Sequence, residues 1–369
     1  MDAVTTARLQ GLLERPLDWE YILTVGRWHG VLPLVHRHLL EAPPSLVPQV
    51  VGERLRLGFE QTQRRNLYLS LHLGAILKRF AAEGIAAIPY KGPTLAVMAY
   101  GRLGLREFLD LDILVKKDDV LRAKDVLVAE GYRPVSRLRK AEERALVESQ
   151  HAYVLDRPDG IVVELHWEIS PRYVSRSPEP ERFWERLSPV VLTGTTVHTL
   201  PPEVLLPSLC EHGAKHIWGR LAWICDIGEL VQARPDLDWP RIVSEARRTG
   251  SERMLALGLR LANDLLGAPM PEAVRRYAET DAAILLLVSE VRMALFRNRS
   301  GLPGLLEQAR FHLRVHEQWR QRLRYCWLAL TTVTVEDLEQ RPLPRALSFL
   351  HYPMRLIRLA GGAFRHRHH

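Results

Sequence analysis

The feature that most constrains the fold of this chain is a change of hydrophobic periodicity near residue 80 and another near residue 200. Before residue 80, apolar residues recur at helical spacing, and the stretch 54–80 contains no proline and only two glycines. Over 81–200 the apolar runs are short and bounded by glycine and proline, as in buried strands. After Pro202 helical spacing returns. The pattern predicts an α+β protein with an N-terminal helical segment over 1–80, a small α/β core over 81–200 and a C-terminal helical domain over 201–369.

Four apolar runs in the central block have the length of strands and are bounded by turn residues. They are Ile85–Tyr90, Leu111–Val115, His151–Leu155 and Ile161–Ile169. The last two flank the turn sequence Arg-Pro-Asp-Gly at 157–160, so they are expected to form a hairpin. Helices are expected at Thr94–Tyr100 and Asp118–Gly131. Pro93 suits the start of the first helix, because a first-turn proline loses no hydrogen bond.

Two carboxylates mark the start of the second predicted strand, in the sequence Asp-Leu-Asp-Ile-Leu-Val at 110–115. Residues two apart face the same side of a strand, so Asp110 and Asp112 present their carboxylates together. The pair repels unless a cation lies between them, and oxygen ligands of this kind suit Mg²⁺ or Mn²⁺. Glu164 lies among apolar residues of the fourth run, where a buried acid needs an ion partner or a metal. Three carboxylates on two strands therefore predict a two-metal phosphoryl-transfer site.

A glycine-containing loop precedes the acidic pair and lies between a predicted strand and a predicted helix. Gly92 lets a phosphate approach the backbone, and the N-terminus of the following helix favours an anion. Lys91 adds a point charge beside it. Arg106 follows this loop and precedes the acidic pair, so it is placed either to hold a phosphate or to brace the loop. We expect this segment to bind phosphate.

These motifs form an ordered series that extends along most of the chain. The series comprises Lys91-Gly92 with Leu95-Ala96, Tyr100-Gly101, Arg106 with Asp110–Val115, Gly131-Tyr132, Glu164–Trp167, His212–Asp226, Asp238-Trp239 and Leu343–Leu359. In this order the sequence resembles the uncharacterised nucleotidyltransferase family of the polymerase-β superfamily. The resemblance implies a small mixed sheet as the core, between the N-terminal helices and the C-terminal helical domain.

The resemblance also implies a reaction. A nucleotidyl group would pass from a nucleoside triphosphate to an acceptor by a two-metal, in-line mechanism. Asp110 and Asp112 would hold both Mg²⁺ (or Mn²⁺) ions, and Glu164 would hold the ion on the nucleophile side or act as a base. Catalysis would then come from positioning and charge neutralisation, as in phosphoryl transfer generally.

One position departs from the pattern of the wider superfamily. There the loop glycine is followed by a glycine or serine that contacts the nucleotide phosphates, whereas this chain has Pro93. Proline has no N–H to donate. We expect Lys91 or Thr94 to supply the contact instead.

A later segment adds polar residues that suit the same site. One helix is expected to begin near Cys210 and to continue through Asp226, with His212 and Lys215 on one stripe of it. This helix could close over the cleft and bring Lys215 or His212 near the triphosphate. The alternative is that the stripe packs in the core and its polar groups bond to one another.

The amino-acid composition indicates the class of protein and the cellular compartment that suits it. Apolar residues make up 47% and charged residues 25%, as in an average globular protein. No apolar run reaches the roughly 18 residues that a transmembrane helix needs, and the N-terminus lacks the pattern of a secretory signal. Three scattered cysteines cannot form a disulfide framework. We expect a cytoplasmic protein without a transmembrane segment.

Positive charge is concentrated at the C-terminal end. The residues from Arg292 onward sum to +9, and the rest of the chain sums to −1. Such an end can bind nucleic acid, anionic lipid or an acidic partner. A solvated, arginine-rich helical surface is the simpler interpretation, so nucleic acid is a secondary candidate partner.

Three functions remain open from the sequence. The first is nucleotidyl transfer from a nucleoside triphosphate to a small molecule or to a peptide or protein side chain. The second is a metal-dependent glycosyl or sugar-phosphate transferase, which also uses an Asp-x-Asp pair but usually places a larger nucleotide-binding sheet before it. The third is a non-catalytic protein that binds a nucleotide or a partner.

Overall fold

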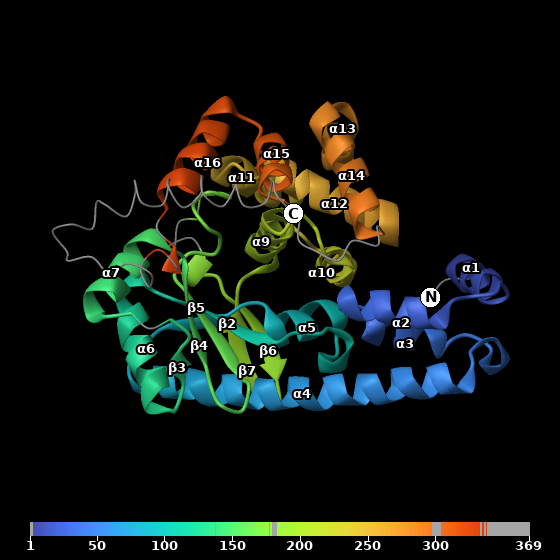
Figure 1. The fold of residues 1–369 in the computed structure, drawn as a ribbon, viewed down its shortest axis with the longest axis horizontal. Helices are drawn as coiled ribbons and strands as arrows, with labels where there is room; N and C mark the ends of the chain where they lie inside the picture. Colours follow the sequence, from blue (N-terminus) through green and yellow to red (C-terminus); the bar gives the residue numbers. More distant parts are fainter. Residues whose placement is uncertain are drawn as a thin grey trace, which may run out of the picture.

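The structure, a computed structural model, describes residues 3–136, 138–176, 178, 183–296, 304–332, 334, 335 and 337. Its elements run from helices through a mixed sheet to helices again (Figure 1), which confirms the predicted α+β class. The N-terminal helices are α1 (Ala3–Leu13), α2 (Trp19–Trp28), α3 (Leu32–Leu39) and α4 (Gln49–Ala82), with a short 3₁₀ helix, η1 (Pro44–Leu46), before α4. The division into three domains at residues 80 and 200 stays a prediction.

The central block holds the strands. In chain order it comprises β1 (Ala87–Pro89), α5 (Gly92–Tyr100), η2 (Leu103–Leu105), β2 (Asp110–Val115), η3 (Lys117–Asp119), α6 (Val120–Ala129), β3 (Arg133–Pro134), α7 (Lys140–Ser149), β4 (Ala152–Asp156), β5 (Val162–His166), β6 (Ser188–Leu192) and β7 (Thr195–Thr199). All four predicted strands are present, and β4 and β5 form the predicted hairpin.

The C-terminal part is helical. It comprises α9 (Pro202–Lys215), α10 (Leu221–Ala233), α11 (Trp239–Thr249), α12 (Glu252–Leu266), α13 (Glu272–Thr280), α14 (Ala282–Leu295), α15 (Leu305–Val315) and α16 (Trp319–Thr331). Among the described residues, no helix is long and apolar enough to cross a membrane. The predicted Leu343–Leu359 motif and most of the basic end lie outside the described residues.

The main sheet has the strand order β1-β2-β5-β4-β3. Strands β2 and β5 pair in parallel, and the other pairs are antiparallel, so the sheet is mixed as expected. The register of the parallel pair places Asp112 of β2 beside Glu164 of β5. Strand β2 is an interior strand of this sheet, and it is buried on both faces, with Ile113 on one face and Leu114 on the other.

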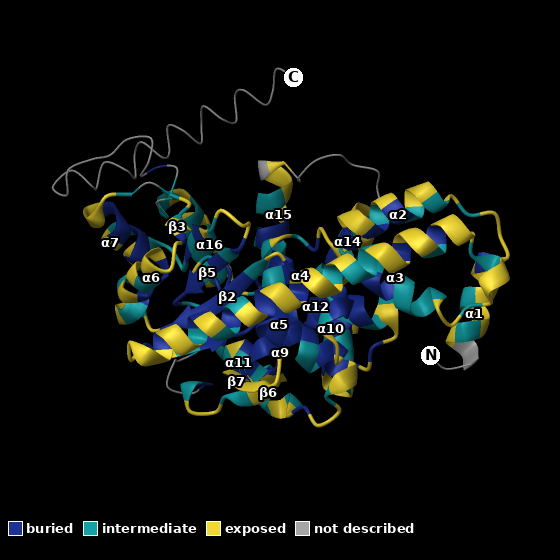
Figure 2. Cartoon of the chain, turned by 90° about the horizontal axis from the view of Figure 1, so that it is seen from below, coloured by how far each residue is buried: buried dark blue, intermediate teal, exposed yellow. Residues whose placement is uncertain are grey.

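Helix α4 covers one face of this sheet, as its course below the strands in Figure 1 shows. It contributes Leu69, Leu73, Ile76 and Phe80, at helical spacing, to the core that contains most of the apolar residues of β2 and β5. Its outward side is largely exposed (Figure 2). A second core joins α5 to the helices α9, α10 and α12. Helix α5 therefore lies between the sheet and the C-terminal helices.

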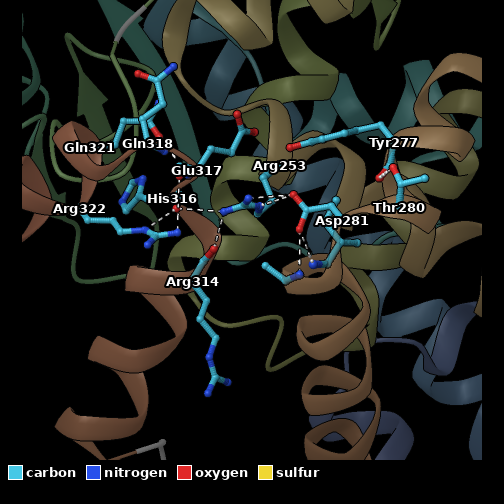
Figure 3. A network of polar contacts seen from close by, with 12 residues as sticks. Arg253, Tyr277, Thr280, Asp281, Arg314, His316, Glu317, Gln318, Gln321 and Arg322 are labelled. Atoms are coloured by element: carbon cyan, nitrogen blue, oxygen red, sulfur yellow. Dashed lines mark hydrogen bonds and ion pairs between the residues drawn. The ribbon is translucent and has the colours of Figure 1, made fainter.

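A polar network attaches the last helices to the rest of the C-terminal part (Figure 3). Arg253 of α12 donates to Oδ2 of Asp281 from Nε (3.0 Å) and Nη2 (2.8 Å). Its Nη1 donates to the carbonyls of Arg314 (2.9 Å) and His316 (3.0 Å), at the end of α15. Asp281 also caps α14 by accepting from the N–H of Ala283. One guanidinium thus joins α12 to the N-terminus of α14 and the C-terminus of α15.

The single helix predicted from Cys210 to Asp226 is wrong. Helix α9 ends at Lys215, and α10 begins only at Leu221. Between them Ile217 (φ 54°) and Trp218 (φ 53°) take left-handed backbone conformations.

The burial of one indole explains this break. Two left-handed residues cost roughly 1–2 kcal/mol each. Trp218 is fully buried and packs where a Cβ on Gly213 would lie. Burying an indole of 150–250 Å² contributes roughly 4–6 kcal/mol. The strain of the two residues and the buried Trp218 Nε1, which has no partner among the described residues, offset part of this gain.

Candidate active site

A cavity of about 380 Å³ lies between the sheet and the helices α9 and α10. Seven of the nine predicted site residues line it. They are Lys91, Arg106, Asp110, Asp112, Glu164, His212 and Lys215. The other two, Gly92 and Thr94, are not among the lining residues. The structure thus brings most of the predicted residues together, although they come from segments that are far apart in the chain.

Asp112 and Glu164 both line this cavity, because the β2–β5 register sets them side by side on one face. The neighbouring His166 lies two residues beyond Glu164 and therefore shares that face. One ligand atom from each of these three residues lies within 4.8 Å of the other two. His166 Nε2 is 3.1 Å from Asp112 Oδ1 and 3.2 Å from Glu164 Oε2. The contact between His166 and Glu164 follows from this alternation, because both side chains lie on one face of β5.

Asp110 lines the same cavity but does not belong to this three-residue cluster. Burial and the nearby carboxylates of Asp112 and Glu164 raise the pKa of Asp110 to about 6. The proximity of like charges is the property that the Asp-x-Asp spacing predicted. A metal-binding role for Asp110 stays a prediction.

Asp112 is the most strongly compensated of the carboxylates. Lys91 Nζ donates to its Oδ1 at 3.0 Å. Burial alone would raise the pKa of Asp112, but the Lys91 ammonium and the hydrogen bond with His166 hold that pKa well below its usual range. Burial would likewise lower the pKa of Lys91, but Asp112 raises it above the usual value. The Lys91–Asp112 pair is therefore ionised at neutral pH.

The loop at the start of α5 has a structural reason for its glycine. Gly92 has φ 42°, and a Cβ there would lie 3.3 Å from the carbonyl oxygen of Asp110. Glycine therefore allows the loop to pack on the start of β2. Pro93 lies in the first turn of α5, as expected. Thr94 is buried, and its hydroxyl donates to the Lys91 carbonyl (2.9 Å). A phosphate contact by Gly92 or Thr94 stays a prediction.

Arg106 lies at the cavity wall with its guanidinium held by a distant residue. Its Nε and Nη2 donate to the two oxygens of Asp226 on α10, at 2.7 and 2.9 Å. Asp226 is buried and also accepts from the hydroxyl of Tyr100 (2.7 Å). The guanidinium therefore braces the segment before β2 against α10, which was one of the two expected roles. Its Nη1 is buried without a hydrogen-bond partner among the described residues.

His212 and Lys215 project from the last turns of α9 into the cavity. Burial, reinforced by repulsion from Lys91, lowers the pKa of Lys215 to about 8. Burial likewise lowers the pKa of His212 well below its usual value, so this imidazole is neutral at pH 7. Trp223 of α10 packs edge-on to His212, with ring centroids 5.4 Å apart. These residues form the wall that faces the sheet carboxylates.

Sequence reasoning missed several residues of the cavity wall. They are Glu107, His151, Ser170, Glu211 and Arg220. Glu211 is buried and accepts a hydrogen bond from Ser170, and burial raises its pKa. A charged residue inside the apolar stretch at 204–214 is a signal that could have found Glu211. The other four carry no comparable local pattern.

The residues present fit a divalent cation. Asp112 and Glu164 offer oxygen ligands close enough to share one ion, and Asp110 adds a carboxylate to the same cavity. Oxygen donors suit Mg²⁺ and Mn²⁺, and the nearby imidazole of His166 favours Mn²⁺ if it becomes a ligand.

The sequence from residue 15 to residue 267 matches the family model described as uncharacterised nucleotidyltransferase. This match covers more than half of the chain, so the chain belongs to that family, as its motifs indicated. No curated protein matches the sequence.

Two solved structures are similar in part. One is described as antibiotic-resistance factor ANT(2'')-Ia, with 12% identity, a TM-score of 0.34, and coverage of 50% of this chain and 91% of that chain. The other is an antigenic nucleotidyltransferase-like protein from Paracoccidioides brasiliensis, with 14% identity, a TM-score of 0.32, and coverage of 56% and 96%. At these TM-scores neither likeness carries a further argument.

Proposed function

We propose that this protein transfers a nucleotidyl group from a nucleoside triphosphate to an acceptor, with Mg²⁺ or Mn²⁺. The observation that carries the proposal is the pairing of Asp112 with Glu164 on adjacent strands, in a cavity that also holds Asp110. Family membership favours nucleotidyl transfer over the glycosyl or sugar-phosphate transfer that an Asp-x-Asp pair also suits.

In this proposal Asp110, Asp112 and Glu164 hold the metal ions, which would neutralise charge on the triphosphate and lower the pKa of the acceptor oxygen. The acceptor oxygen attacks the α-phosphorus in line, the bond to the bridging oxygen breaks, and pyrophosphate leaves with that oxygen. Glu164 is the candidate to receive the acceptor proton. Lys91 and Lys215 bind the phosphates. Arg106 fixes the position of the cavity wall beside these lysines through its bonds to Asp226.

The acceptor is proposed to be a small molecule or a peptide or protein side chain. The basic end remains a secondary surface for nucleic acid, and most of it lies outside the described residues. The cytoplasm is the proposed compartment. The free cysteines Cys210, Cys225 and Cys326 are compatible with a reducing one.

The test uses the four labelled nucleoside triphosphates, with Mg²⁺ or Mn²⁺, incubated with host extract to supply acceptors. We expect label transfer that EDTA abolishes. The Asp110→Asn/Asp112→Asn double variant should lose metal-dependent triphosphate binding or turnover while circular dichroism shows an intact fold. Unchanged activity in this variant would contradict the metal assignment.

Glu164→Gln separates acceptor activation from binding. Because its carboxylate is proposed to act mainly on the acceptor side, the substitution should lower kcat far more than triphosphate affinity. Equal losses in both would place Glu164 in triphosphate binding instead. Binding without turnover for any triphosphate in the unaltered protein would favour a non-catalytic nucleotide-binding role.

A further inference from the structure

One oxygen of Asp112 receives two donors from different elements. Oδ1 accepts from Lys91 Nζ at 3.0 Å and lies 3.1 Å from His166 Nε2. The three side chains are close to fully buried, with exposures of 12% for Lys91, 5% for Asp112 and 4% for His166. A carboxylate oxygen has two lone pairs, so these two donors saturate Oδ1.

A second observation concerns the charge that a metal would bring. Asp110, Asp112 and Glu164 place three carboxylates in one cavity, and the ammonium of Lys91 is the cation in direct contact with Asp112. Lys215 faces the same cavity, but among the described ion pairs none includes it. Lys91 therefore supplies positive charge beside Asp112 of the kind that a divalent ion would bring.

From this geometry we infer that Lys91 is a resident counter-ion of Asp112. A divalent cation that binds at Oδ1 displaces the Lys91 ammonium, which then binds a phosphate of the triphosphate. The inference rests on the proposed function and adds a role for Lys91 in controlling metal binding. Lys91 immediately precedes α5, so its four-carbon side chain lies beside the helix N-terminus that favours an anion. When the ammonium leaves Asp112, a phosphate held there is its next partner.

If Lys91 exchanges Asp112 for a phosphate, replacing Lys91 should change the metal affinity and the triphosphate affinity in opposite directions. Removing the ammonium frees one lone pair of Oδ1 and takes a positive charge away from Asp112, so the metal alone should bind more tightly. The triphosphate loses a charged donor, so it should bind more weakly. An ion that no longer competes with a charge-assisted hydrogen bond gains about tenfold or more in affinity, and the triphosphate loses about ten- to a hundredfold. A purely structural role for Lys91 would weaken both.

The experiment measures Mn²⁺ binding to the full chain without nucleotide, by electron paramagnetic resonance of the free ion. Lys91→Met and Lys91→Gln should each bind Mn²⁺ about tenfold or more tightly than the unaltered protein, and Lys91→Arg should remain close to it. Lys215→Met removes the same charge from the same cavity without breaking a described ion pair, and should change Mn²⁺ affinity by less than about threefold. The glutamine variant removes the charge but keeps a polar side chain, and serves if the methionine variant fails to fold.

Titration of a non-hydrolysable triphosphate at saturating Mn²⁺ distinguishes failure of the proposed function from failure of the counter-ion inference. No binding by the unaltered protein would overturn the proposed function. Triphosphate binding by the unaltered protein, together with folded Lys91 variants that bind Mn²⁺ alone no more tightly, would overturn the resident counter-ion and leave the proposed function standing. Tighter Mn²⁺ binding with weaker triphosphate binding in the same variant would establish the exchange.

Discussion

Lys215 is the cavity residue whose charge should change within an accessible pH range. Burial and repulsion from Lys91 lower its pKa to about 8, whereas Lys91 stays charged beside Asp112. Below pH 8 the Lys215 ammonium can bind a phosphate oxygen, and above it the neutral amine cannot supply the charge. Triphosphate affinity should therefore fall as the pH rises through about 8.

Calorimetric titration of a non-hydrolysable triphosphate with Mg²⁺ at pH 7 and pH 9 measures this dependence. At pH 7 the triphosphate affinity of Lys215→Met should be roughly ten- to a hundredfold lower than that of the unaltered protein. Between pH 7 and pH 9 the affinity of this variant should change little. A pH dependence that persists in this variant would assign the titration to another group.

The residues that sequence reasoning found are those whose relation depends on local periodicity. The alternation of a strand put Asp110 on the face of Asp112. The partner of Arg106 could not be found in this way, because Asp226 lies 120 residues away and reaches it only through tertiary packing. The Lys91–Asp112 contact was not predicted for a different reason. The sequence analysis assigned Lys91 to phosphate binding, and no sequence pattern shows which of two nearby anions a lysine side chain contacts.

At the scale of elements, the Arg253 guanidinium is the main polar attachment described between α12 and the start of α14. Arg253 and Asp281 are 11% and 13% exposed. Arg253→Ala should destabilise the protein by roughly 3–5 kcal/mol, because it leaves Asp281 with a poorly compensated charge in a largely buried position. The loss should appear as a lower urea midpoint for unfolding, followed by circular dichroism.

A paired substitution separates the charge from the contact. Arg253→Met/Asp281→Asn removes both charges, keeps much of the apolar volume of Arg253 and leaves an amide oxygen that can still cap α14. It should recover part of the stability that Arg253→Ala loses. A double variant that is as unstable as the single variant would show that the carbonyl contacts to Arg314 and His316 matter more than the ion pair.

Element boundaries were predictable where one residue type enforces them. Gly101, which ends α5 with φ 69°, is an example. The break between α9 and α10 was not predictable, because Ile217 and Trp218 are residues that rarely take positive φ. Their conformation depends on the pocket beside Gly213 and Gly258 that receives the indole. That pocket is a tertiary feature, which local propensity does not record.

At the scale of the whole molecule, buried neutral histidines should set the acid limit of stability. Burial lowers the pKa of His29, and it lowers the pKa values of His312 and His316 to about 4. Unfolded histidines titrate near 6.5, so below that pH the unfolded chain binds more protons than the folded chain. Stability should therefore fall as the pH drops from about 6.5 towards 4, by up to about 1.4 kcal/mol per pH unit for each such histidine.

Urea unfolding at pH 7, 6 and 5 measures this slope. His316→Leu removes one titrating group from the contact with Tyr325 and should make the decline shallower by one histidine's share. An unchanged slope in this variant would show that His316 does not titrate between pH 7 and pH 5, and would assign the acid sensitivity to other buried histidines such as His312.

The parallel pairing of β2 with β5 also bears on how the protein folds. In the chain these strands are separated by α6, β3, α7 and β4, so a long loop must close before Asp112 and Glu164 meet. Non-local pairings of this kind form slowly compared with helices. During refolding, helical signal should therefore recover before the capacity to bind Mn²⁺. Mn²⁺ binding by the two carboxylates would then report that the sheet is complete. A ligand that bridges them would stabilise the slowly formed pairing of β2 with β5.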